Sequence, residues 1–180
     1  DVKGESRDPP LREPMLVRGD VDAITGHYFT SILNLKAQGI SKDDLTVFKY
    51  FDYGMDFYGN ALIASPDMMK DHPEELRGFL RAVVKGWRDA IADPAEAIAA
   101  LKEVDPLIST DLEIQRLQMT IDENVVTEVT LKEGMGQIKT DRMAKAIDQV
   151  SLAFGIEKKP SVGDLFTDIF MPGQKDRMLK

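Results

Sequence analysis

The chain has 180 residues, 43% of them hydrophobic and 30% charged, which is typical of a globular protein with a substantial core. Its 31 acidic and 23 basic residues give a net charge of -8, and no run of Lys or Arg is interleaved with aromatic residues. Nucleic acid and anionic membrane surfaces are therefore poor partners. The absence of cysteine excludes disulfide bonds, thiolate metal sites and a cysteine nucleophile.

The chain begins DVKGESRDPP, without an initiating Met and without a signal peptide. No apolar run approaches the length of about 20 residues that spans a bilayer. We therefore expect that the N-terminal part of a longer protein is missing and that any export signal lay there. Such a fragment would expose strand edges and apolar surface, so we expect it to associate with the missing part or with itself.

The first 40 residues predict two strands that alternate with two helices. Residues 2–3 are expected to end a strand, and residues 9–17 to form a helix that has proline in its first turn. The sequence VDAIT, residues 21–25, predicts a short buried strand. Gly26 is the expected turn, and residues 27–37 are expected to form the second helix.

This strand-glycine-helix junction is a candidate ligand site. It presents Thr25, Gly26, His27 and Tyr28 around free backbone N–H groups at a helix N-terminus. Such groups bind an anionic or carbonyl-bearing ligand. For His27 two interpretations stay open: a ligand contact, or a helix-start residue that bonds to its own backbone.

The stretch from Lys49 to Ser65, KYFDYGMDFYGNALIAS, alternates aromatic residues with small polar ones. A pocket needs this combination in order to sandwich a small molecule and to orient it. Residues 45–50 and 58–64 predict two further strands. The alternative interpretation, in which these aromatic residues are ordinary core, stays open.

Beyond Ser65 the chain is predicted to be helical, because capping residues open segments with apolar positions at the 3, 4 and 7 spacing. Trp87 lies on the apolar face of the longest helix and is expected in the core. Residues 124–139 are expected to be irregular, because Gly134 and Gly136 interrupt them. Residues 66–70 are expected to form one short turn, and the predicted helices cover residues 73–91, 94–103, 110–123 and 140–154. Four apolar residues of the tail are expected to dock on the rest of the chain: Leu165, Phe166, Ile169 and Phe170.

Residues that carry catalysis or bind metals are sparse. The two histidines, His27 and His72, lie in different predicted elements, and no metal-binding motif occurs. A phosphate-binding loop and a nucleophile elbow are absent as well. Asp52 and Asp56 have the spacing of an acid and base pair, but around Gly54 they equally suit a turn. We therefore expect no catalytic residue, no metal site and no cofactor.

Three motifs together carry a resemblance to a known family. They are the GDVDA strand, the YGNALIAS strand and the helix PEELRGFLRAVVKGW. With them, nearly the whole chain resembles the solute-binding proteins of nitrate, taurine and sulfonate-type ABC transporters. The similarity is closest to the branch with binders of thiamine-pyrimidine precursors and the related fungal pyrimidine synthases.

The resemblance implies an α/β fold of the type II periplasmic-binding-protein kind, in which two lobes close on a ligand by a hinge motion. It implies that this chain is the C-terminal portion of that fold, helix-rich after residue 65. Residues 1–50 would be the remainder of lobe two, and residues 51–64 would cross between the lobes. Residues 65–180 would form the C-terminal part of lobe one, with a helical tail.

The same resemblance implies a cleft lined by both candidate stretches. The residues that would face it are Gly26, His27, Tyr28, Tyr53, Asp56, Tyr58 and Asn60. The ligand class stays open among sulfonates, nitrate-like anions, pyrimidines and other small metabolites. The aromatic residues favour a planar organic ligand over a bare inorganic anion, which would need Arg or Lys that the sequence does not place nearby.

The function that the resemblance implies is the substrate-binding component of an ABC importer, which acts without catalysis. Its partners would be a small-molecule ligand and an ABC permease, and its location would be periplasmic or lipid-anchored outside the cytoplasm. One alternative is a pyrimidine-precursor biosynthetic enzyme of the same fold, although the chain lacks the Cys-rich motif of the fungal synthases. The other alternative is a ligand-sensing domain.

Overall fold

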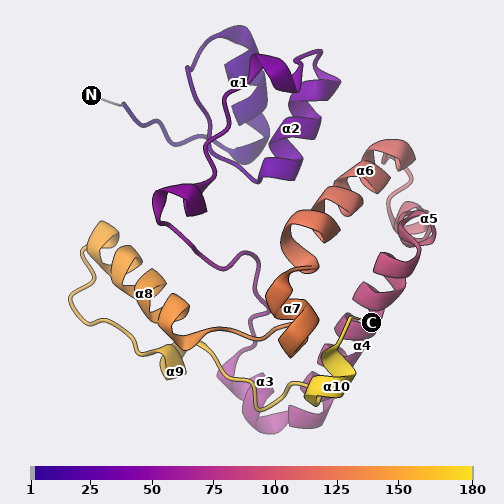
Figure 1. Ribbon diagram of the computed structural model, residues 1–180, viewed down its shortest axis with the longest axis vertical. Helices are drawn as coiled ribbons and strands as arrows, with labels where there is room; N and C mark the ends of the chain where they lie inside the picture. The colour runs from indigo at the N-terminus through magenta and orange to yellow at the C-terminus, as the bar shows by residue number, and fades with distance from the viewer. Residues whose placement is uncertain (1–2, 180) are drawn as a thin grey trace.

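The computed structural model describes residues 3–179, which contain ten α-helices joined by short turns and extended segments. In Figure 1, α1 and α2 lie at one end, α4, α5 and α6 follow one side, and α8 with α9 lies on the other side. The helices are α1 (Arg12–Arg18), α2 (Tyr28–Ala37), α3 (Pro66–Asp71), α4 (Pro73–Ala92), α5 (Pro94–Val104), α6 (Thr110–Thr120), α7 (Glu128–Glu133), α8 (Thr140–Phe154), α9 (Val162–Leu165) and α10 (Gln174–Arg177). The shorter turns are η1 (Pro9–Leu11), η2 (Lys42–Asp44), η3 (Tyr50–Tyr53) and the π-helical turn η4 (Ile121–Val125).

The N-terminal helices α1 and α2 are joined through a buried polar contact. Glu13 is 6% exposed and accepts a hydrogen bond from the Ser31 hydroxyl at 2.7 Å. This bond satisfies a carboxylate that would otherwise be costly to bury. Leu33 and Leu35 of α2 are buried as well, and α2 packs on α6. The N-terminal pair is therefore attached to the rest of the chain through α2.

Helices α4, α5 and α6 form a layer in which each helix packs on the next. Pro73 and two glutamates of the first turn favour the start of α4. The Asp93 carboxylate caps α5 by accepting a hydrogen bond from the Glu96 backbone N–H at 2.9 Å. Val84 of α4 and Ile98 of α5 are buried. Within residues 3–179, no helix combines the length and the apolar character that crossing a membrane requires.

The predicted strands do not form in the part of the chain that the structure describes. Segments 21–25, 45–49 and 58–64 belong to no regular element, Tyr50 begins η3, and none of these segments pairs with a neighbour as a strand. An extended segment becomes a strand only when a partner accepts and donates hydrogen bonds along its edge. The α/β character is therefore not confirmed in this helix-rich chain. Val2 lies outside the described residues, and Lys3 is in no regular element.

Burial also differs from the prediction. Trp87, expected in the core, is only half-buried, and Ile63, in a segment expected to be a buried strand, is 94% exposed. In the tail Phe170 is buried, whereas Leu165 and Ile169 are exposed. A helix that packs on one neighbour buries a narrow stripe only, so apolar positions outside that stripe stay in contact with water.

The stretch 124–139 was predicted to be irregular because of its glycines, but it contains the helix α7. Thr127 and Thr130 form a capping box at the start of α7, in which the Thr127 hydroxyl accepts from the Thr130 backbone N–H at 3.2 Å. Gly134 ends α7 with a φ of +84°, a conformation that favours glycine. The prediction of an irregular stretch was therefore wrong for Glu128–Glu133.

The C-terminal tail is held by two guanidinium groups that bind main-chain carbonyls. The Arg88 Nε of α4 donates to the Met178 carbonyl at 2.7 Å. Arg177, which is 7% exposed, donates to the carbonyls of Pro172 and Met135 at 2.9 and 2.8 Å. The Arg88 contact holds the tail against α4, where Figure 1 shows α10 in yellow, and the contact with Met135 holds α10 beside the segment that follows α7.

Candidate ligand-binding site

Two lysine side chains, two aromatic rings and a carboxylate meet at the start of α2. We call this group the Tyr28 cluster, and its members are Tyr28, Lys42, Lys49, Phe51 and Glu123. Lys49 Nζ lies 4.8 Å from the Tyr28 ring centroid and 5.8 Å from the Phe51 ring centroid. The same ammonium pairs with the Glu123 carboxylate at 2.8 Å. Lys42 Nζ lies 5.8 Å from the Tyr28 ring centroid.

Short local elements place the members of the Tyr28 cluster. Tyr28 is the first residue of α2, Lys42 begins η2, and Phe51 lies in η3. Glu123 lies in η4, the π-helical turn that continues α6, and single π-helical turns occur frequently at functional sites. The cluster thus brings together α2, the turn η2, residues 45–64, which we call the connecting segment, and the turn that follows α6.

The surroundings of both lysines stabilise the charged form. A hydrogen bond to the Tyr28 side chain raises the pKa of Lys42, with smaller contributions from nearby carboxylates. The hydrogen bond to Glu123 raises the pKa of Lys49, and its charge and the Tyr28 side chain add to that effect. Both side chains therefore carry a positive charge at neutral pH.

A second group of contacts surrounds Arg142 of α8. Its guanidinium carbon lies 4.0 Å from the Tyr58 ring centroid. The guanidinium also pairs with the Asp56 carboxylate at 2.8 Å and donates to the main-chain carbonyl of Phe57 at 2.8 Å. The Tyr58 hydroxyl accepts a hydrogen bond from the Lys139 backbone N–H at 2.7 Å. These contacts attach the connecting segment to α8.

The residues predicted around the start of α2 do lie beside one another there. The Thr25 carbonyl accepts a hydrogen bond from Arg12 Nη1 at 3.0 Å. Gly26 lies against Ser31, where a side chain on Gly26 would collide with the hydroxyl. The His27 ring is exposed and stacks on Phe29 at a centroid distance of 5.6 Å. Tyr28 alone of the four predicted residues belongs to the Tyr28 cluster.

The residues predicted in the connecting segment are divided between different neighbours. Asp56 and Tyr58 contact Arg142, as described above. Tyr53 is 64% exposed and tilts against Phe48 at a centroid distance of 5.9 Å. Asn60 is exposed in the extended part of the segment. The two predicted stretches thus contribute to two separate groups of contacts, and whether any of these residues binds a ligand stays a prediction.

Four charged residues that shape these groups were not predicted to do so. Lys49 and Lys42 lie near the aromatic rings, so the expectation that no lysine would be nearby was wrong. Lys49 lies within the aromatic stretch and could have been considered from its position alone. Glu123 and Arg142 lie about 70 to 90 residues further along the chain, and no sequence signal links them to that stretch.

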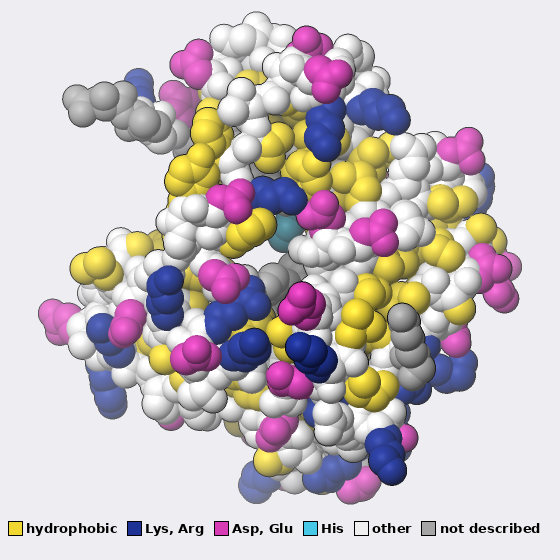
Figure 2. All heavy atoms as spheres, viewed as in Figure 1, with side chains coloured by type: hydrophobic (Ala, Val, Ile, Leu, Met, Phe, Trp, Pro, Cys, Tyr) yellow, Lys and Arg dark blue, Asp and Glu magenta, His cyan; other side chains and the backbone are white. Residues whose placement is uncertain are grey.

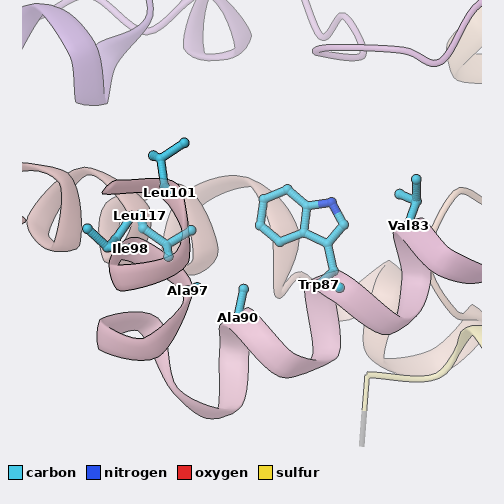
Figure 3. A pocket seen from close by; sticks show the side chains of 8 residues that line it. Val83, Trp87, Ala90, Ala97, Ile98, Leu101 and Leu117 are labelled. Atoms are coloured by element: carbon cyan, nitrogen blue, oxygen red, sulfur yellow. The ribbon is translucent and has the colours of Figure 1, made fainter. Parts of the chain in front are cut away.

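An apolar groove lies away from both groups, between α4, α5 and α6. It has a volume of about 300 Å³, and Trp87 forms one wall (Figure 3). Its lining is almost wholly apolar and offers no charged side chain to orient a ligand: Val83, Gly86, Trp87, Ala90, Ala97, Ile98, Leu101 and Leu117. On the face shown in Figure 2, by contrast, basic and acidic side chains gather around a central hollow.

Comparisons with known proteins give two similarities. Residues 11–97 match a family model described as NMT1/THI5 like, whose domain belongs to the periplasmic-binding-protein-like fold. Over 157 residues the chain is 24% identical to the riboflavin-binding protein RibY of Chloroflexus aurantiacus. That alignment covers 85% of this chain and 43% of RibY, so the chain spans less than half of the length of this relative. No solved structure gives a significant match.

These similarities fit a solute-binding protein family and a ligand-binding role. The name of the relative describes a binding protein, which suggests a function without catalysis. Some relatives in the THI5 group are biosynthetic enzymes, so the family likeness leaves room for both activities.

Proposed function

We propose that this chain is part of the substrate-binding component of an ABC importer and that it binds a small planar metabolite without transforming it. The observation that carries the proposal is the pair of rings, Tyr28 and Phe51, whose centroids lie 4.8 and 5.8 Å from one ammonium group. Rings arranged in this way can stack on a flat ligand, and aromatic stacking contributes about 0.5 to 1.5 kcal/mol beyond burial. Lys42 and Glu123 supply polar groups that can orient the ligand.

The relative RibY is named for riboflavin, a flat heteroaromatic compound of the kind that two rings can sandwich. Pyrimidines and aromatic sulfonates share that flat shape, and they remain within the proposed class. In the whole protein the ligand would lie in a cleft between two lobes, and a permease would receive it outside the cytoplasm. The exposed aromatic side chains of η3 support this proposal, because Phe51 is 58% and Tyr53 64% exposed.

A biosynthetic enzyme of the same fold is the second candidate, and His27, exposed at the start of α2, is the residue that favours it. Such an enzyme would need a lysine that loses its proton in order to anchor a carbonyl cofactor. The raised pKa values of Lys42 and Lys49 oppose this, because a protonated amine is not a nucleophile. We therefore propose a binding function.

The test is a thermal-shift and fluorescence titration of the protein with riboflavin, aminopyrimidines and aromatic sulfonates. A ligand that binds only the folded state raises the melting temperature, and at 100 times its Kd it stabilises by about 2.7 kcal/mol. Tyr28→Ala and Phe51→Ala are each expected to weaken binding at least tenfold. Phe154→Ala is the matched control, because Phe154 is 79% exposed on α8.

The proposal is contradicted if none of these compounds binds, or if Tyr28→Ala and Phe51→Ala bind as tightly as the unaltered chain. The importer role has its own test. Deleting the gene is expected to abolish cellular uptake of the compound that binds, and undiminished uptake would contradict that role.

A further inference from the structure

The Tyr28 cluster already surrounds one positively charged group, the ammonium of Lys49. The Lys49 ammonium is near the faces of two rings and contacts a carboxylate, at 4.8 Å from Tyr28, 5.8 Å from Phe51 and 2.8 Å from Glu123. An aromatic ring attracts a cation within about 6 Å of its centroid. Two rings and a carboxylate around one ammonium are the arrangement with which proteins recognise organic cations.

The charges around Lys49 also favour a cation at this place. Glu123 makes the largest contribution to the raised pKa of Lys49, and Asp52 contributes as well. Asp43 acts in the same direction on Lys42. Since the whole chain carries a net charge of -8, the long-range field adds to this preference.

The ammonium position is accessible from solvent. The Lys49 and Glu123 side chains are 32% and 43% exposed, and Phe51 is 58% exposed. Lys49 reaches the rings through a flexible chain of four methylene groups, so its ammonium can move into water without a movement of the backbone. A partly exposed ion pair of this kind contributes only about 0 to 1 kcal/mol, so its exchange for another cation is not costly.

We propose that Tyr28, Phe51 and Glu123 form a binding site for an organic cation, and that Lys49 fills this site when the ligand is absent. The proposal rests on the proposed function and names the charge of its ligand. The ligand class is a compound with a substituted ammonium group or a positively charged flat ring. On binding, the ligand takes the place of the Lys49 ammonium beside the two rings, and Glu123 exchanges one cation for the other.

This exchange predicts how the affinity depends on Lys49. Only the fraction of molecules in which Lys49 has left the rings can bind the ligand, and the apparent affinity is reduced by that fraction. Removing the ammonium while keeping the length of the side chain should therefore tighten binding. Removing the carboxylate should weaken it, because Glu123 supplies the opposite charge.

The test uses two compounds with the same ring, 1-methylnicotinamide, which is a cation, and nicotinamide, which is neutral. Binding to the protein is measured by calorimetry, and tetramethylammonium serves as a cation without a ring. We expect the cation to bind at least about tenfold more tightly than nicotinamide. Lys49→Met is expected to tighten binding of the cation by about a further tenfold, and Lys49→Met combined with Glu123→Gln to remove the preference.

Lys70→Met is the matched control, because it removes an ammonium from α3, where the side chain is 83% exposed, and leaves the Tyr28 cluster intact. It should leave affinity for the cation within about twofold. Circular dichroism melts of all variants separate loss of binding from loss of folding. Equal affinities for the charged and neutral rings in both the unaltered chain and Lys49→Met would overturn the inference.

The inference and the proposed function fail in different ways. If riboflavin or a pyrimidine binds and Tyr28→Ala abolishes that binding, but no variant prefers the cation, the function stands and the inference is overturned. If no flat compound binds any variant, charged or neutral, both are overturned. Binding of the cation that is weakened by Tyr28→Ala and by Glu123→Gln supports both.

Discussion

Two regions of the chain differ in what determines their conformation. One is the layer of helices α4, α5 and α6, and the other is the connecting segment 45–64. Each helix of the layer closes its hydrogen bonds within itself and packs on its neighbour, and local signals favour the start of two of them: proline in the first turn of α4 and the Asp93 cap of α5. The connecting segment has little regular structure beyond η3, and side chains of α8 hold its carbonyls. A helix is thus determined by nearby residues, whereas an extended segment takes its shape from whatever binds its backbone.

The largest expected effect is a loss of stability when the core of the α4–α6 layer is truncated. Ile98→Ala removes a side chain that is 5% exposed between α4 and α6, and truncation of a buried isoleucine costs about 3 kcal/mol. Urea unfolding followed by circular dichroism measures this change. Leu107→Ala is the control, because Leu107 is 95% exposed and its truncation should change stability by less than about 0.5 kcal/mol. Equal effects of the two variants would show that the layer has no core at Ile98.

The second prediction concerns the connecting segment. Arg142→Ala removes the bonds to the carbonyls of Asp56 and Phe57 and the pair with the Asp56 carboxylate. Local opening of the segment should become easier by about 1.4 kcal/mol, which corresponds to about tenfold faster cleavage there by a protease. Limited proteolysis with identification of the cut sites measures the change. Lys145→Ala, also on α8, is the control.

If Arg142→Ala instead lowers the stability of the whole chain as much as Ile98→Ala does, the segment and the layer unfold together. The contrast between them would then be wrong.

The third prediction tests how much the local cap of α5 contributes to the stability of the layer. Asp93 accepts a hydrogen bond from the Glu96 backbone N–H, and Asp93→Ala should destabilise the chain by about 1 kcal/mol. Asp93→Asn keeps an acceptor at the same place and should cost much less. Thermal unfolding of both variants measures the difference, and an equal loss in the two would assign the effect to charge and not to capping.

The smallest effect is expected in the pH dependence at the start of α4. The backbone N–H of Glu75 and the His72 side chain, 3.2 Å away, hold the pKa of Glu75 below its ordinary value of 4.5. Folding therefore favours ionised Glu75. This stabilisation is present above pH 4.5 and is lost as the pH falls through the lowered pKa of the folded state.

The change His72→Ala should raise the pKa of Glu75 toward 4.5 without restoring it fully, because the backbone contact remains. Titration of side-chain carboxyl signals by NMR measures this. The pKa of Asp164, which the Ser161 hydroxyl lowers, should not move in that variant. A parallel movement of both carboxyl groups would indicate a change of overall structure.

Most of the helices after Ser65 could be predicted from the sequence, because their signals are local. Ser65 caps α3 through a hydrogen bond from the Met68 backbone N–H at 3.1 Å, and Asp93 caps α5. The strands could not be predicted in the same way. The apolar run 60–64 suits a buried strand, yet Ile63 is 94% exposed, since burial of such a run depends on a partner that sequence distance does not reveal.

The candidate site was predictable in its aromatic part only. Tyr28 and the stretch that contains Phe51 have a recognisable composition, and the structure brings the two rings near one ammonium. Glu123 completes the group from 74 residues further along the chain than Lys49. The position of Glu123 beside Lys49 depends on the packing of α6 on α2, a long-range contact that no local sequence pattern predicts.

The way in which α8 holds the connecting segment has a consequence for evolution. Arg142 and Gln149 bind the main-chain carbonyls of Gly54, Asp56 and Phe57, and every amino acid has such a carbonyl. Substitutions in the segment therefore leave most of its attachment intact. Descendants of this protein can change the side chains that meet a ligand, and so the compound that they recognise, while the segment keeps its place.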